Sequence, residues 1–252
     1  MIRRVVFALA LVASASPASA QNAILFFPRF DFHLSADHLS SDDTRFVWDT
    51  NFGGDMDLVD YGRGRSTFAV NYEAVLGEQF RRFDPNQGNY LLDLSTSLRA
   101  HGIEVAALFH HTSRHLSDRF KLSPVDWNMF GASVAHDARH GAMQICTQGD
   151  LLGVLLKSSV DYSWEANGGV SIRVPLHPHI SAISAGSARL VGVDGTRNRG
   201  MQRGARGEAG VRFEGQGGAV EVIVAAERRI DPYPLENSAM SWFSAGFRFV
   251  SR

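Results

Sequence analysis

Residues 205–227 read ARGEAGVRFEGQGGAVEVIVAAE, and their side chains alternate between two kinds. From Ala205 to Glu214, small or apolar residues fill the odd positions and Arg or Glu fill most of the even ones. After the GQGG segment, valines occupy every second position from Val220 to Val224. Successive side chains of a β-strand point to opposite faces. The stretch therefore predicts two amphipathic strands joined by a Gly-rich turn.

The same alternation recurs along the chain, whereas helical periodicity is nearly absent after residue 20. Many of the alternating segments are about ten residues long, the length that a tilted strand needs to cross a membrane. Charges of both signs recur in their polar rows, which suits a narrow lumen that contains ion pairs. These features predict an all-β fold, an antiparallel transmembrane β-barrel. Further alternating segments are residues 68–76, 103–109, 160–166 and 242–250.

Short turns and longer connections also alternate, as they do in barrels with short periplasmic turns and long outer loops. Counting the segments between them gives about twelve strands, with ten as the main alternative. Phe243, Phe247 and Phe249 near the C-terminus resemble the aromatic last strand of bacterial outer-membrane proteins. A secreted, soluble β-sandwich stays open, because its apolar rows would pack against each other.

The first twenty residues have the features of a secretory signal peptide. Arg3 and Arg4 are positively charged and residues 5–12 are apolar. Ala18-Ser19-Ala20 forms a small-x-small cleavage site. We therefore expect a signal peptide at 1–20 and a single barrel domain at 21–252, exported to the outer membrane.

Composition limits the possible partners. The 252 residues carry 25 Lys and Arg against 26 Asp and Glu, a formal net charge of −1, which excludes a strongly basic nucleic-acid surface. The lone Cys146 excludes an intramolecular disulfide framework and a Cys-rich zinc site. We expect no cofactor and no metal. The expected partners are outer-membrane lipids, including lipopolysaccharide, and the outer-membrane assembly machinery; the oligomeric state stays open.

The densest polar cluster is LFHHTSRHLSD at residues 108–118. The apolar, lipid-facing row of the strand that begins at Ile103 continues in steps of two to His111, Ser113 and His115. A His-x-Ser pair on one strand face puts a base close to a hydroxyl, as nucleophilic catalysis requires. A hairpin through 99–102 would pair Leu98 with Ile103 and put Tyr90 opposite His111. That register offers no clear third group to orient the imidazole.

Two other interpretations of this cluster stay open. It could be a polar strand end at the headgroup level, where Arg114, Arg119 and Lys121 pair with lipopolysaccharide phosphates. A metal site would use His111 and His115 with Asp118, although one strand supplies two ligands at most. The candidate binding residues are Arg114, His115, Asp118, Arg82 and Asp84. A second basic segment, expected in an outer loop, contains Arg197, Arg199, Arg203 and Arg206.

Two family resemblances arise from these residues. The stretch His111-x-Ser113-x-His115-Leu116-x-Asp118 resembles a motif of an uncharacterised family of bacterial outer-membrane barrels, which also carries an upstream stretch like Arg82-Phe83-Asp84. That resemblance implies a barrel of unknown biochemical role over most of the mature chain.

More narrowly, His111-x-Ser113 is similar to the active-site pair of outer-membrane phospholipase A and of the lipid A deacylases. In both families the pair lies on the outside of the barrel, at the lipid boundary. The Asn-Gly that follows the serine in the phospholipases is replaced here by Arg114-His115.

Three functions follow from these observations, and the sequence leaves open whether the chain is an enzyme. The first is a structural or narrow, poorly conducting barrel, because charged side chains would fill a lumen of about twelve strands. The second is an interfacial acyl ester hydrolase that acts on phospholipid or lipid A, with Ser113 as nucleophile, His111 as base, and Arg114 or backbone N–H groups as oxyanion donors. The third is a soluble β-sandwich that acts as a binding module.

Overall fold

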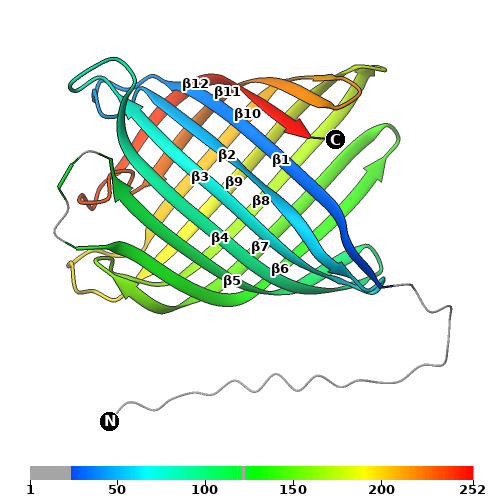
Figure 1. The fold of residues 1–252 in the computed structure, drawn as a ribbon, viewed down its shortest axis with the longest axis horizontal. Coiled ribbons are helices and arrows are strands. Elements are labelled where there is room, and N and C mark those ends of the chain that lie inside the picture. Colours follow the sequence, from blue (N-terminus) through cyan, green and yellow to red (C-terminus); the bar gives the residue numbers. More distant parts are fainter. Residues whose placement is uncertain (1–23, 118, 121–122, 252) are drawn as a thin grey trace, which may run out of the picture.

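A computed structural model describes residues 24–117, 119–120 and 123–251. These residues form a closed antiparallel barrel in which each strand pairs with its neighbours in the sequence (Figure 1). The expected number of twelve strands is confirmed. They are β1 Leu25–Leu39, β2 Trp48–Asp60, β3 Arg65–Gly77, β4 Asp84–Ala100, β5 Ile103–Leu116, β6 Val125–His140, β7 Met143–Ser158, β8 Tyr162–His177, β9 Ile180–Val193, β10 Gln202–Glu214, β11 Gly218–Ile230 and β12 Ala239–Ser251.

The barrel closes between its first and last strands. β1 pairs with β12 from His33 opposite Val250 to Leu39 opposite Ser244. A single closed sheet leaves no second layer for the apolar rows to pack against, so the soluble β-sandwich is wrong. The described residues include no helix that could cross a membrane. The expected signal peptide lies outside the described residues, as do Asp118 and Lys121.

The two faces of the strands differ as the alternation predicts. On the outside, Val224 and Phe243 are 60% and 71% exposed. On the inside, the neighbouring Glu221 is only 6% exposed, because it pairs with Arg212 and Arg248. An apolar outer face and a polar inner face match lipid outside and a polar lumen inside.

Arginines that bridge several carboxylates cross-link the lumen wall. The Arg206 guanidinium contacts Asp37, Glu208 and Glu227 at 2.9–3.1 Å. Arg229 likewise contacts Asp49, Glu73 and Glu227, at 2.5–2.8 Å. Carboxylates from strands far apart in the sequence thus converge on one cation. The expected ion pairs of the polar rows are confirmed.

Short turns and long loops occupy opposite ends of the barrel. At the short-turn end, His101 and Gly102 join β4 to β5, with φ of 53° and 78°. Two left-handed residues in succession form the tight turn that matches strand twist, so Ala100 pairs with Ile103. The register expected for this hairpin is therefore wrong by two residues on β4, and Tyr90 lies opposite Ser113.

Candidate functional site

The candidate residues lie on β5, near the long-loop end of the barrel. His111, Ser113 and His115 continue the outward-facing row, as expected from Ile103 onward. Ser113 Oγ lies 2.8 Å from His115 Nε2. His111 Nδ1 lies 2.9 Å from Asn128 Oδ1, on the neighbouring strand β6. Each imidazole of the row therefore has a polar partner on the outer surface.

Asn128 is the orienting group that the sequence analysis did not find. It pairs directly with His111 in the β5–β6 register. The alternation of short turns and longer connections predicts a long loop over residues 113–128, whereas β5 runs to Leu116 and β6 begins at Val125. The available signal was parity, because Asn128 lies two positions before the exposed Phe130 and so shares its outward face.

The Asn128 contact fixes the protonation pattern of His111. The amide oxygen can only accept a hydrogen bond, so Nδ1 is the donor in this contact, and the neutral tautomer that makes it has its lone pair on Nε2. That pattern is the one a general base needs. His111 and Ser113 are two residues apart on a single strand face, a spacing of about 7 Å between their Cα atoms.

Aromatic side chains place this row at the membrane interface. Phe52, Tyr72 and Tyr90 follow one another across β2, β3 and β4 on the outer surface, with ring centroids 6.0 and 5.0 Å apart. The Tyr90 ring meets His115 edge-on at 5.5 Å, and Tyr90 pairs with Ser113 in the register. Tyrosines on a barrel's outer surface mark the headgroup level. Ser113 therefore lies beside this tyrosine row on the outer surface.

Arg114 faces away from this site. Its guanidinium points into the barrel and donates hydrogen bonds of 2.6 Å to the carbonyl oxygens of Asp231 and Pro232. Strand alternation explains the difference, since the residue between two outward side chains must point inward. In this structure Arg114 therefore contacts the loop after β11 and does not extend toward Ser113.

Of the other expected binding residues, the two that the structure describes, Asp84 and Arg82, have their own surroundings in the loop and strand before β5. Asp84 is buried and bonds to Arg119 at 2.6 Å, while Arg82 is exposed in the loop between β3 and β4. Arg199, expected in a solvated basic loop, is instead largely buried between Asp161 and Asp231. No group of three or more His, Cys, Asp and Glu side chains could hold a metal within the described ranges.

β5 also carries a second polar row, which faces the lumen. His110 Nδ1 lies 2.5 Å from Asp93 Oδ1, and His110 Nε2 lies 2.8 Å from Thr112 Oγ1. The strand thus presents one His-x-hydroxyl pair outward and another inward. A side-chain oxygen of a neighbouring strand orients each imidazole. Asn128 of β6 contacts His111 on the outside, and Asp93 of β4 contacts His110 on the inside.

Comparison with known proteins supports the fold. No family model and no curated protein sequence matches the chain. Outer membrane phospholipase A from Escherichia coli, in an active-site mutant, is similar with a TM-score of 0.54 and 12% identity, over 89% of this chain and 91% of that one.

Two further structures are similar. Phospholipase A from Salmonella typhi, a dimer with bound calcium, has a TM-score of 0.53 and 12% identity, over 89% and 91% of the two chains. An outer membrane channel from Pseudomonas putida F1 has a TM-score of 0.52 and 12% identity, over 94% and 99%. The chain thus has the fold of outer-membrane barrels, which together with its apolar outer face supports the expected outer-membrane location.

Proposed function

We propose that this barrel is an interfacial acyl ester hydrolase with Ser113 as nucleophile, His111 as general base and Asn128 as the group that orients His111. One observation carries the proposal: the contact between His111 and Asn128 on the lipid-facing surface beside Ser113. A hydroxyl, an imidazole and an orienting oxygen are the three parts of a hydrolytic triad. The substrates are ester bonds of phospholipid or lipid A, because these lie at the depth of the tyrosine row.

The reaction has two steps, formation of an acyl-enzyme and its hydrolysis. Ser113 Oγ bonds to the ester carbonyl carbon while its proton moves to His111 Nε2, and the leaving alcohol takes that proton as its C–O bond breaks. Water then attacks the acyl-enzyme by the same route, which releases the fatty acid and restores Ser113. His115, carrying its proton on Nε2, donates to Ser113 Oγ in the resting state. It then supplies an N–H group close to the developing oxyanion.

A structural neighbour supports the role of an asparagine. The E. coli phospholipase structure is described as an active-site mutant in which alanine replaces asparagine. An asparagine in that active site agrees with the role we give Asn128. Cleavage of the signal peptide at 1–20, contact with lipopolysaccharide and insertion by the assembly machinery belong to the same proposal.

Fatty acid release from phospholipid in detergent micelles tests the proposal. The purified barrel should release fatty acid, and Ser113→Ala should abolish the release. Ser66→Ala is the matched control, since Ser66 also faces outward but lies near the short-turn end of β3. No release by the native barrel, or release that survives Ser113→Ala, would overturn the proposal. Loss with His115→Ala but not with His111→Ala would move the base to His115.

A second role, a narrow and poorly conducting barrel, is favoured by the way the long-loop end is filled. Inward-facing apolar side chains form a buried cluster there that includes Trp127, Met129 and Val191. Planar-bilayer recordings test this role. A large, stable conductance of the native barrel would contradict it.

A further inference from the structure

A short segment after β11 lies across the long-loop mouth of the barrel. We call residues 231–234 the strap. Asp231, Pro232 and Pro234 are buried, although they belong to a loop. Asp231 has a φ of 46°, a left-handed conformation that is unfavourable for a residue with a side chain. The loop therefore turns into the mouth at a conformational cost, which its contacts must offset.

The strap is held from the opposite side of the barrel. In the closed order of strands, β5 and β11 are six places apart in either direction, so they face each other across the lumen. Arg114 of β5 nevertheless reaches the carbonyl oxygens of Asp231 and Pro232 at 2.6 Å. These two hydrogen bonds connect opposite walls of the barrel above the lumen.

The carboxylate of the strap is fixed by a second set of contacts. Asp231 accepts hydrogen bonds from Tyr162 Oη at 2.7 Å and from both terminal nitrogens of Arg199 at 2.7 and 2.8 Å. Arg199 also bridges to Asp161 at 2.5 and 2.8 Å. Asp161, Arg199 and Asp231 come from three different loops. We call them the latch, because together they tie the strap to the rim.

Below the strap, the lumen holds a polar chamber of about 470 Å³. Three buried polar atoms of residues that line the chamber have no hydrogen-bond partner within the described residues: Asn89 Oδ1, Trp127 Nε1 and Arg189 Nε. Buried polar groups are normally hydrogen-bonded.

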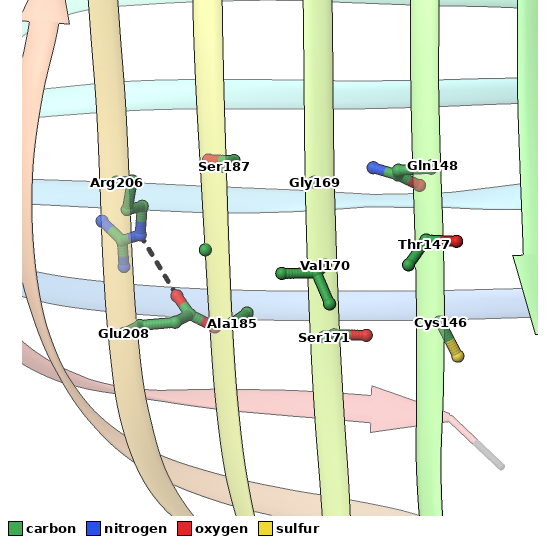
Figure 2. Close-up of a pocket in the computed structure, with 11 residues that line it drawn as sticks. Cys146, Thr147, Gln148, Gly169, Val170, Ser171, Ala185, Ser187, Arg206 and Glu208 are labelled. Atoms are coloured by element: carbon green, nitrogen blue, oxygen red, sulfur yellow. Dashed lines mark hydrogen bonds and ion pairs between the residues drawn. The ribbon is translucent and has the colours of Figure 1, made fainter. Parts of the chain in front are cut away.

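The chamber continues toward the short-turn end. A second cavity, of about 260 Å³, shares Gln148, Ser187 and Arg206 with the first. Figure 2 shows the Arg206 and Glu208 pair on β10 beside the small inward residues of β9 and β8, among them Ala185, Ser171 and Gly169. Because the inward side chains of β8 and β9 are small, they leave open space beside the Arg206 and Glu208 pair of the neighbouring strand β10.

We propose that the barrel is also a channel for small polar solutes and that the strap is its outer gate. The chamber is lined by hydrogen-bond donors and acceptors and by paired side chains of positive and negative charge. The channel therefore accepts uncharged or zwitterionic solutes that fit the chamber. It needs no part of the outward Ser113 row, so it stands independently of the proposed hydrolysis.

Neutralising the latch tests the gate. The triple variant Asp161→Asn, Arg199→Leu and Asp231→Asn removes all three charges together, which avoids leaving one buried and unpaired. In planar bilayers the native barrel should give brief or absent conductance steps, and the triple variant a steady conductance. In vesicle swelling, the variant should admit monosaccharides. Unchanged conductance of a folded triple variant would overturn the proposal.

A matched control lies along the lumen wall. Arg212 also bridges two carboxylates, Glu214 at 3.2 Å and Glu221 at 2.8 Å, but all three are on the adjacent strands β10 and β11. The triple variant Glu214→Gln, Arg212→Leu and Glu221→Gln therefore loses a comparable ion cluster without touching the mouth. Its conductance should stay at the native level. If this control variant conducted as steadily as the latch variant, loss of any ion cluster in the barrel would be enough to open it. That result would overturn the proposal that the strap is the gate.

A second variant covers the case in which the latch variant fails to fold. Ile230 and Ala239 are paired, so an Asn-Gly turn can replace residues 231–238 and close the hairpin directly. This barrel lacks the strap and should conduct steadily. The equivalent control replaces residues 78–83 between the paired Gly77 and Asp84 and should remain silent. If the barrel without the strap showed no conductance, the lumen itself would be blocked and the proposal would be overturned. Fatty acid release should persist in both variants, since neither alters Ser113, His111 or Asn128.

Discussion

At the scale of single residues, the decisive feature is that neighbours on β5 serve opposite faces of the barrel. His111 and Ser113 face lipid, whereas His110, Thr112 and Arg114 face the lumen. A substitution at one of these positions therefore alters either the outer surface or the lumen, and not both. This separation makes the hydrolytic site and the strap testable independently in one protein.

Asn128→Ala should reduce fatty acid release while leaving the barrel folded. The variant leaves His111 Nδ1 without its acceptor, so the imidazole loses its fixed orientation and tautomer. We expect a loss of about 10- to 1,000-fold in kcat, less than the full contribution of a general base, which is about 100- to 10,000-fold, because His111 itself is retained. Asn128→Asp should retain much of the activity, because a carboxylate oxygen can accept the same bond. Equal activity of Asn128→Ala and the native barrel would refute the role of Asn128.

Arg114→Met should destabilise the barrel. It leaves the carbonyl oxygens of Asp231 and Pro232 without their donor, at a cost of about 1–3 kcal/mol for each buried acceptor. Urea unfolding, followed by heat-modifiable migration on gels, measures the change. Arg82→Met is the control, because Arg82 is exposed in a loop and should alter stability little. A native unfolding midpoint for Arg114→Met would argue against the strap contacts.

At the scale of strands, the period of two decides which solvent each side chain meets. The β10–β11 hairpin shows this with Val211 opposite Val222 on the outside and Arg212 opposite Glu221 on the inside. The position of each turn then sets which residues face one another. On β5 the two-residue turn at 101–102 puts Ser113 beside Tyr90, so turn length determines the surroundings of the nucleophile.

Val224→Lys should destabilise the barrel by about 2–4 kcal/mol, the cost of a basic residue on the lipid face near mid-membrane. Val224 lies in the middle of β11 and is 60% exposed on the outer face. Ser187→Lys provides the contrast, because Ser187 points into the lumen beside the polar cavities. Folding titrations in lipid vesicles compare the two. A larger loss for Ser187→Lys than for Val224→Lys would reverse the assignment of faces.

At the scale of the whole molecule, closure of twelve strands gathers groups that are distant in the sequence. Arg229 of β11 reaches Asp49 of β2 and Glu73 of β3, and Arg114 of β5 reaches the strap. The closed sheet thus provides a polar lumen, and the outer loops fill its mouth. The proposed outward triad and the proposed gate both depend on this one barrel geometry.

Conductance should be insensitive to moderate acid and increase only in strong acid. The Arg199 guanidinium bonds to Asp161, in the loop between β7 and β8, and lowers the pKa of that carboxyl. A lowered pKa means that the latch's contribution is complete above the unfolded value of about 3.9 and is lost as pH falls below it. Bilayer recordings at about pH 7, 5 and 3 should show opening only at the lowest value. Opening at about pH 5–6, where histidines titrate, would point to a different group.

The sequence by itself determined the strand pattern and the faces. The alternation of apolar and polar residues predicts twelve strands, an apolar exterior and charged inner rows, because the period of two is a local property of the extended backbone. The same parity puts His111, Ser113 and His115 on the outer face. These expectations need only residue types and their spacing.

Only the tertiary structure decided which residues meet. The His111–Asn128 contact depends on the β5–β6 register, which follows from where each strand ends. The inward turn of Arg114 to the strap depends on closure of the barrel, which sets β5 opposite β11. Register and closure are set by hydrogen bonds and ion pairs between strands, and these are non-local, so alternation along one strand cannot specify its partner's alignment.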